Sequence, residues 1–165
     1  MKGEEEEPKF IVDGMLGKVA RWLRILGYDA KYYNSLSDEE LIKIAMEEGR
    51  ILLTRDLNLH KRALTENLSS LLLDEKSKID NLTKLVREFK IRVDIDVSLS
   101  RCPKCNSKLK AASKEAVASK VPEMSYKKFK EFWICPNCGQ VYWQGSHWKD
   151  IYRTLKEIRA RTLPH

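Results

Sequence analysis

The sequence predicts an α/β fold in which a parallel sheet carries helices on both faces, with a small second module and a C-terminal helix behind it. Over the first hundred residues, short apolar runs alternate with amphipathic helical segments, which is typical of a parallel sheet. Two Cys-x-x-Cys pairs then follow, Cys102 with Cys105 and Cys135 with Cys138. Four cysteines at this spacing are the usual ligands of a structural zinc ion, so the second module is predicted to be a zinc ribbon.

Four apolar runs predict the strands of the sheet. They are almost wholly apolar, as expected of strands that are covered on both faces. The runs span Lys9–Asp13, Tyr28–Tyr33, Arg50–Asp56 and Leu68–Leu73.

A helical segment is expected after each of these strands. The first has apolar residues at helical spacing and ends before Gly27. The second begins with Ser37 as its N-cap and has Glu40 at the capping-box position. The helices are expected at Met15–Leu26, from Ser37 to Gly49, at Leu57–Leu64 and at Ile79–Phe89.

The cysteine pairs are separated by a longer gap than in the commonest zinc modules, which predicts an insertion between the two zinc knuckles. Gly139 follows the second pair, at a position where a positive φ is often needed. The alternative is a pair of local disulfides or redox dithiols, which is unusual for a small chain with no other cysteine.

The chain is therefore divided into four predicted parts. A disordered acidic tail is expected over 1–8, the α/β domain over 9–95, the zinc ribbon over 101–148 and a basic helix over 149–165. Ile91–Leu99 is expected to form an edge strand or a linker. The beginning of the sequence has no signal-peptide pattern, no apolar run could span a membrane, and reduced cysteines predict a cytoplasmic protein.

The positive charge of the chain is concentrated in its second half. Residues 1–100 carry 17 Lys and Arg against 19 Asp and Glu, whereas residues 101–165 carry 14 against 5. A basic zinc module is typical of a protein that binds a polyanion, most often a nucleic acid. His147 and Trp148 lie in an aromatic segment next to this module and are candidate RNA contacts. The alternative for His147 is a structural hydrogen bond, and the alternative for Trp148 is packing in the core of the module.

Acidic residues follow the predicted strands. Asp13, Asp56 and Asp74 each stand at a strand end, and Asp38 opens the helix after the second strand. Because the carboxyl ends of parallel strands share one edge, these side chains are expected to form a pocket for Mg²⁺ or Mn²⁺, which prefer oxygen ligands. Such ions promote phosphodiester hydrolysis. The alternative for Asp13 and Asp38 is a helix-capping or first-turn role.

Several specific stretches carry a resemblance to a known family. They are Phe10–Asp29, Ser37–Leu41, Ile51–Asp56, both cysteine pairs and Tyr142–Trp148. They resemble the Mut-seven C-terminal RNase domain family, which is described as a PIN-like nuclease fold joined to a zinc ribbon. The match extends from Phe10 to about Tyr152.

The resemblance implies an endoribonuclease that depends on a divalent metal. By position, Asp13, Asp38 and Asp56 match the family's acids, with Glu39 or Glu40 as substitutes for Asp38. Asp74 is the nearest candidate for the fourth acid of a PIN-type site.

Three arginines near these acids, Arg21, Arg24 and Arg55, are candidates for contacts with substrate phosphate. For the first two, which lie on one side of a helix, the alternative is a solvated helix face.

The resulting hypothesis is a ribonuclease with catalytic Mg²⁺ or Mn²⁺ and structural zinc, in which the zinc ribbon and the basic helix bind RNA. The main alternative is a non-catalytic RNA-binding or ribonucleoprotein assembly factor with a degenerate acidic pocket. A toxin of a toxin–antitoxin pair is disfavoured by the zinc extension. Pairing into a homodimer is left open because PIN-like domains often pair.

Overall fold

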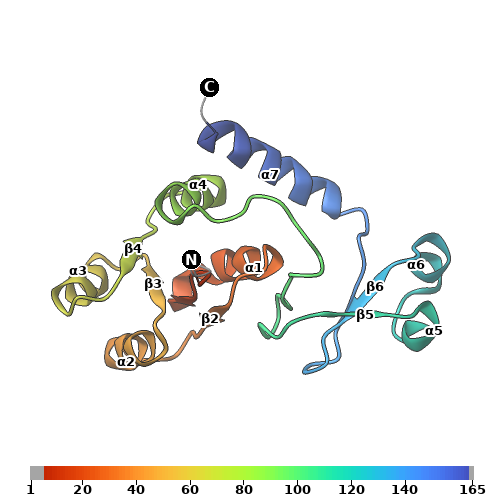
Figure 1. Cartoon of the computed structure of the whole chain (residues 1–165), viewed down its shortest axis with the longest axis horizontal. Coiled ribbons are helices and arrows are strands. Elements are labelled where there is room, and N and C mark those ends of the chain that lie inside the picture. The colour runs from red at the N-terminus through yellow and green to blue at the C-terminus, as the bar shows by residue number, and fades with distance from the viewer. Residues whose placement is uncertain (1–5, 164–165) are drawn as a thin grey trace, which may run out of the picture.

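A four-stranded parallel sheet forms the centre of the computed structural model, which describes residues 6–163 (Figure 1). The strand order is β2-β1-β3-β4, so the first strand lies in the middle and the chain crosses over it. The strands are β1 (Phe10–Val12), β2 (Ala30–Tyr32), β3 (Ile51–Thr54) and β4 (Ser70–Leu72). All three neighbouring pairs are parallel, which confirms the fold class expected from the alternating pattern.

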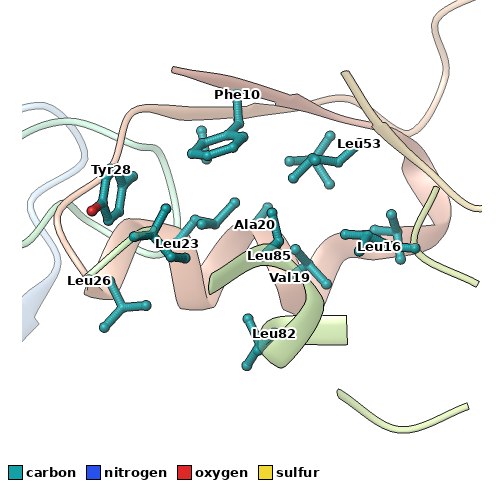
Figure 2. Packing of buried hydrophobic residues seen from close by; sticks show 14 of the residues in the cluster. Phe10, Leu16, Val19, Ala20, Leu23, Leu26, Tyr28, Leu53, Leu82 and Leu85 are labelled. Carbon is teal, nitrogen blue, oxygen red and sulfur yellow. The ribbon is translucent and has the colours of Figure 1, made fainter. Parts of the chain in front are cut away.

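Both faces of the sheet are covered by helices, because successive side chains of a strand point to opposite faces. Phe10 and Leu53 point toward one helical layer, as Figure 2 shows, and Ile11 and Leu52 belong to a second core cluster on the other face. The first layer contains α1 (Gly17–Ile25), α4 (Lys78–Phe89) and α7 (Trp148–Thr162), and the second contains α2 (Asp38–Glu48) and α3 (Leu57–Thr65).

The helix boundaries follow the predicted caps. Ser37 and Glu40 form the expected capping box at the start of α2, and Gly49 ends that helix with φ 63°. Gly27 follows α1 with φ 95°, where a Cβ atom would lie 2.9 Å from Nη2 of Arg92. The one difference is that the helix expected from Met15 is preceded by a 3-10 turn, η1 (Gly14–Leu16), before α1 begins.

Residues 91–99 form no strand, so the edge-strand alternative for this segment is wrong and it is a linker. Its apolar side chains explain why. Ile91 is buried in the first core cluster, and Val93 and Ile95 pack against that cluster, so the segment runs over the helical layer.

A three-stranded antiparallel sheet forms the second module, with the order β5-β6-β7. The insertion expected between the cysteine pairs is present as two short helices, which share a small core with the sheet around Val117 and Phe132. The elements are β5 (Lys110–Ala112), α5 (Lys114–Val117), α6 (Glu123–Lys128), β6 (Phe132–Ile134) and β7 (Val141–Tyr142).

The basic C-terminal helix α7 returns to the first domain and lies along α4 (Figure 1). Leu155 and Ile158 enter the first core cluster, and Ile151 packs against it. Arg161 pairs with Asp80 of α4 at 2.6 Å. Within residues 6–163, no helix combines the length and the apolar composition that crossing a membrane requires.

The acidic tail expected over 1–8 falls mostly outside the described residues, which begin at residue 6. At the other end, residues 164 and 165 of the expected basic segment are likewise outside them.

Candidate active site and metal centre

Two of the predicted acids, Asp13 and Asp56, are joined through one buried hydroxyl at the carboxyl edge of the sheet. They follow the neighbouring strands β1 and β3. Thr54 is fully buried at the end of β3, and its Oγ1 donates to Oδ2 of Asp13 at 2.9 Å. The same oxygen accepts a hydrogen bond from the backbone N–H of Asp56 at 3.0 Å. The strand pairing and this threonine therefore place the two acidic residues side by side.

Asp13 and Asp56 also cap the helices that follow them. The capping role considered as an alternative for Asp13 is therefore present, and it does not prevent metal binding. Oδ1 of Asp13 accepts from the N–H of Gly14 at 2.7 Å. Oδ1 of Asp56 accepts from the N–H groups of Asn58 at 2.8 Å and Leu59 at 3.2 Å. Within the described residues, Oδ2 of Asp56 makes no hydrogen bond, so this oxygen is free to meet a ligand.

Asp38 is the third acid of this edge, at the first turn of α2 after β2. Desolvation, together with the negative charges of Asp56 and Asp13, raises the pKa of Asp38 above its ordinary value. The carboxylates of Asp56 and Asp13 are therefore near enough to Asp38 to disfavour its charged form, and a bound cation would favour that form.

The two glutamates considered as substitutes for Asp38 are engaged elsewhere. Glu39 pairs with Arg62 of α3 at 3.1 Å. Glu40 accepts from the backbone N–H of Ser37 in the capping box at 2.9 Å. Asp38 is therefore the acid of this helix that electrostatics connects with Asp13 and Asp56.

The predicted fourth acid, Asp74, has a different neighbour. It follows β4, and its carboxylate lies 3.9 Å from Nζ of Lys84. Asp74 is not among the main charges that act on Asp38. The acids that the structure draws together are therefore Asp13, Asp38 and Asp56.

The carboxylates are close enough to repel but do not form a closed ligand set. Across residues 6–163, the only group of three or more metal-binding side chains whose ligand atoms all lie within 4.8 Å of one another is that of the four cysteines. Mg²⁺ usually retains several waters and takes only one or two carboxylates directly. An open group of carboxylates at one edge of the sheet fits that mode of binding.

The four cysteines form a compact cluster that could hold a metal ion. The Sγ atoms of Cys102 and Cys138 are 3.7 Å apart, and those of Cys105 and Cys135 are 3.3 Å apart. A tetrahedral site with Zn–S bonds of about 2.3 Å needs sulfurs about 3.8 Å apart, so the residues fit zinc. The pairs that lie close come from different knuckles, which argues against two local disulfides.

The two zinc knuckles have the same backbone form. In each, the residue after the second cysteine is left-handed, with φ 74° at Asn106 and 79° at Gly139. The N–H of each of these residues donates at 2.8 Å to the carbonyl of the first cysteine in its pair. Asn106 was missed in the sequence, although its place in Cys-Pro-Lys-Cys-Asn matches that of Gly139 in Cys-Pro-Asn-Cys-Gly.

Asn106 also ties the first knuckle to the parallel sheet. Its Oδ1 accepts from the N–H of Ala30 in β2 at 3.0 Å, and its Nδ2 donates to Oδ1 of Asp29 at 2.8 Å. Asp29 is itself held by Arg50, whose guanidinium donates to both carboxylate oxygens. The cysteine cluster is therefore connected to the strands through side chains far apart in the sequence.

Arg24 requires a correction to the predicted RNA-contacting set. It is only 6% exposed, and it donates to the carbonyls of Ala30 at 2.9 Å and Pro103 at 2.8 Å. Its burial and these contacts give it a structural role between α1, β2 and the first knuckle. Neither a surface phosphate contact nor a solvated helix face describes it. Its neighbour Arg21 is exposed.

The other predicted RNA contacts lie in three places. Arg55 is exposed between Thr54 and Asp56 at the acidic edge. His147 is exposed at the start of α7 and lines a cavity of about 670 Å³ with Phe129 and other residues of the zinc module. Trp148 is half-buried, and its Nε1 donates to the carbonyl of Trp143 at 3.1 Å, so it helps to hold the turn that presents His147.

Comparison with known proteins identifies the family. The profile described as the Mut7-C RNAse domain matches residues 8–155, which include the parallel sheet, the acidic edge and all four cysteines. The chain belongs to the Mut7-C RNAse domain family. The Mut7-C match begins just before β1 and ends within α7, so it covers both modules of the fold.

A curated relative of this Mut7-C chain is the human protein named Exonuclease mut-7 homolog. The two are 36% identical over 101 residues, which is 59% of this chain and 12% of that protein. The chain thus spans a small part of its longer relative. No solved structure matches the Mut7-C chain.

The role of Asn106 in the Mut7-C chain can be tested with a reciprocal pair of substitutions. We expect Asn106→Gly to keep zinc, because glycine tolerates the positive φ, but to lower the free energy of unfolding by about 1–3 kcal/mol. The reason is that the N–H of Ala30 and the carboxylate of Asp29 each lose a partner. Thermal or denaturant unfolding with zinc analysis measures both effects.

The matched control is Gly139→Asn, which places asparagine at the equivalent left-handed position. A Cβ atom there meets nothing within 4 Å, so a change below about 1 kcal/mol is expected. Equal losses in the two variants would mean that Asn106 stabilises the knuckle alone and not its attachment to the sheet.

Proposed function

We propose that this chain is a ribonuclease that cleaves RNA internally, with Mg²⁺ or Mn²⁺ held by Asp13, Asp38 and Asp56. Membership of an RNAse domain family supports a nuclease function. The observation that carries the proposal is the buried hydroxyl of Thr54, which donates to Asp13 and accepts from the backbone N–H of Asp56 and so holds these two residues side by side at the carboxyl edge of the sheet. Desolvation and the charges of Asp56 and Asp13 raise the pKa of the third acid, Asp38. A carboxyl group whose pKa is raised by neighbouring carboxylates at a strand edge is a candidate ligand for a cation.

The residues around the acids have definite tasks in this proposal. Thr54 and the two capping interactions hold Asp13 and Asp56 in fixed orientations, which preorganises the carboxylate of Asp13 and the free Oδ2 of Asp56. Arg55 stands between Thr54 and Asp56, where its guanidinium can bind a phosphate of the substrate. A bound divalent ion would lower the pKa of a water molecule in contact with it and would compensate the negative charge that develops on the phosphate.

The cysteine centre has a separate role, because four thiolates leave no open position on zinc for a water molecule. We propose that it is structural and that the basic module around it binds the RNA backbone. Residues 101–165 carry 14 Lys and Arg against 5 Asp and Glu. The cavity near His147 combines Phe129 and Trp143 with Lys127 and Lys128, and aromatic and basic side chains together suit unpaired RNA.

Cleavage of a mixed RNA pool tests the proposed function. We expect internal cleavage of RNA by the zinc-loaded full chain when Mn²⁺ or Mg²⁺ is added, and no cleavage when the divalent ion is omitted. Products separated on a denaturing gel, with end-labelled and circular RNA, distinguish internal cutting from trimming of ends.

Two outcomes would contradict the proposal. Tight RNA binding without cleavage, whatever the metal, would favour the non-catalytic RNA-binding or assembly factor. Degradation of linear RNA only, with circular RNA left intact, would replace internal cleavage by exonuclease action.

A further inference from the structure

A cavity of about 370 Å³ lies between the first helix of the α/β domain and the first zinc knuckle. Its walls come from parts of the chain that are far apart in the sequence. Arg21 and Arg24 belong to α1, Tyr32 to β2, Lys104 to the knuckle and Tyr142 to β7. The cavity therefore exists only because the zinc module is attached to the parallel sheet.

Three cations line this cavity, and none of them forms an ion pair with a carboxylate within residues 6–163. Arg24 is buried, and its Nε and Nη1 atoms donate hydrogen bonds to backbone carbonyls. Arg21 and Lys104 are exposed on either side. The exposed Arg21 and Lys104 are therefore available to bind an anion in this cavity.

The cavity also reaches toward the acidic edge. The hydroxyl of Tyr32 donates to the carbonyl of Gly14 at 2.8 Å, and the N–H of Gly14 donates to Asp13 at 2.7 Å. Gly17 lies against the same tyrosine, since a Cβ atom there would be 3.2 Å from its hydroxyl oxygen. Two hydrogen bonds thus separate the cavity wall from the first acid of the proposed active site.

We propose that this cavity binds the nucleotide beside the scissile phosphodiester of an unpaired RNA strand, with Arg21 and Lys104 contacting its phosphates. The position relative to the cut rests on the proposed function, whereas binding itself does not. Half-buried Tyr32 and Tyr142 provide aromatic surface for a sugar or base. The strand must be unpaired, because a base held in a duplex cannot turn into a recess between two modules.

Binding of labelled single-stranded RNA to the Arg21→Ala/Lys104→Ala double variant tests the proposal. Both proteins carry Asp56→Asn, so that cleavage does not interfere, and are zinc-loaded. The double variant should bind about 25-fold more weakly at about 0.1 M salt. The slope of log affinity against log salt should fall in magnitude by about 1.4, since each phosphate contact to a single strand contributes about 0.7. Fluorescence anisotropy measures both quantities.

The matched control is Lys43→Ala/Lys61→Ala, which removes two exposed charges from α2 and α3 on the other face of the sheet. We expect it to bind RNA within about threefold of the parent. Zinc content and melting temperature of both double variants should equal those of the parent, because all four side chains are exposed.

Three outcomes would overturn the proposal: unchanged binding by the cavity variant, equal losses in the cavity and control variants, or equal affinity of the parent for duplex and single-stranded RNA. A different result is possible if the cavity variant alone loses binding and the wild-type chain never cleaves RNA. That result would support the cavity as an RNA-binding site and reject the proposed ribonuclease activity.

Discussion

Asp56→Asn is expected to lower the rate of RNA cleavage by about a hundredfold or more, while the fold and RNA binding are kept. The substitution removes a negative charge from the acidic edge. Electrostatic stabilisation of the transition state lowers the activation barrier by several kcal/mol, and its loss slows cleavage accordingly. Asparagine is as good an N-cap as aspartate, so its side-chain oxygen can still accept from the N–H groups of Asn58 and Leu59. Single-turnover cleavage with saturating Mn²⁺ gives the rate, and the melting temperature reports on the fold.

Two further substitutions sharpen this experiment. Glu47→Gln removes an exposed charge from the other end of α2, and it should leave the cleavage rate within about twofold. Asp74→Asn decides whether the fourth predicted acid takes part, because this residue faces Lys84 and not the other acids. If Asp56→Asn cleaves as fast as the wild type, the assignment of the acidic edge as the active site is wrong.

Cys135→Ser is expected to release zinc, to unfold the module that contains β5, β6 and β7, and to abolish RNA binding by that module. Zinc binding contributes about 10 kcal/mol or more to the folding of zinc-finger peptides, which is comparable to the stability of a whole domain. The small core around Val117 and Phe132 cannot replace that contribution. Zinc content, circular dichroism and fluorescence anisotropy with labelled RNA measure the three parts of this prediction in turn.

The effect should extend into the parallel sheet through named contacts. Loss of the first knuckle removes the partners of the N–H of Ala30 and of Nη1 of Arg24. We therefore expect faster hydrogen exchange in β2 and a lower melting temperature for the α/β domain. Lys104→Ala, a non-ligand change within the first knuckle, should retain zinc and normal exchange. A Cys135→Ser protein that binds no metal but exchanges like the wild type would show that the module folds without zinc.

The local features of the fold were predictable because they depend on neighbours in the sequence. The almost wholly apolar runs predicted strands that are covered on both faces, and this is confirmed by the two core clusters on opposite faces of the sheet. The capping box of Ser37 and Glu40 is an interaction over three residues. Clustering of the four cysteines followed from two short motifs, each of which folds as an independent turn.

The long-range contacts were not predictable in this way. Arg24 was expected at a phosphate, yet it binds the carbonyl of Pro103, 79 residues away. No periodicity or local motif distinguishes this buried arginine from the exposed Arg21 three residues before it. The segment 91–99 was equally ambiguous, because apolar residues suit both an edge strand and a linker packed on helices.

The sequence by itself determined the α/β class, the helix caps, the cysteine centre and the acids at the strand ends, since each depends on residue types within a few positions of one another. Only the tertiary structure decided which acids share one neighbourhood, how Asn106 and Arg24 join the two modules, and where unpaired cations remain. These features depend on the packing of segments that are distant along the chain. The residues that make such contacts carry no local sequence pattern by which the contacts could be predicted.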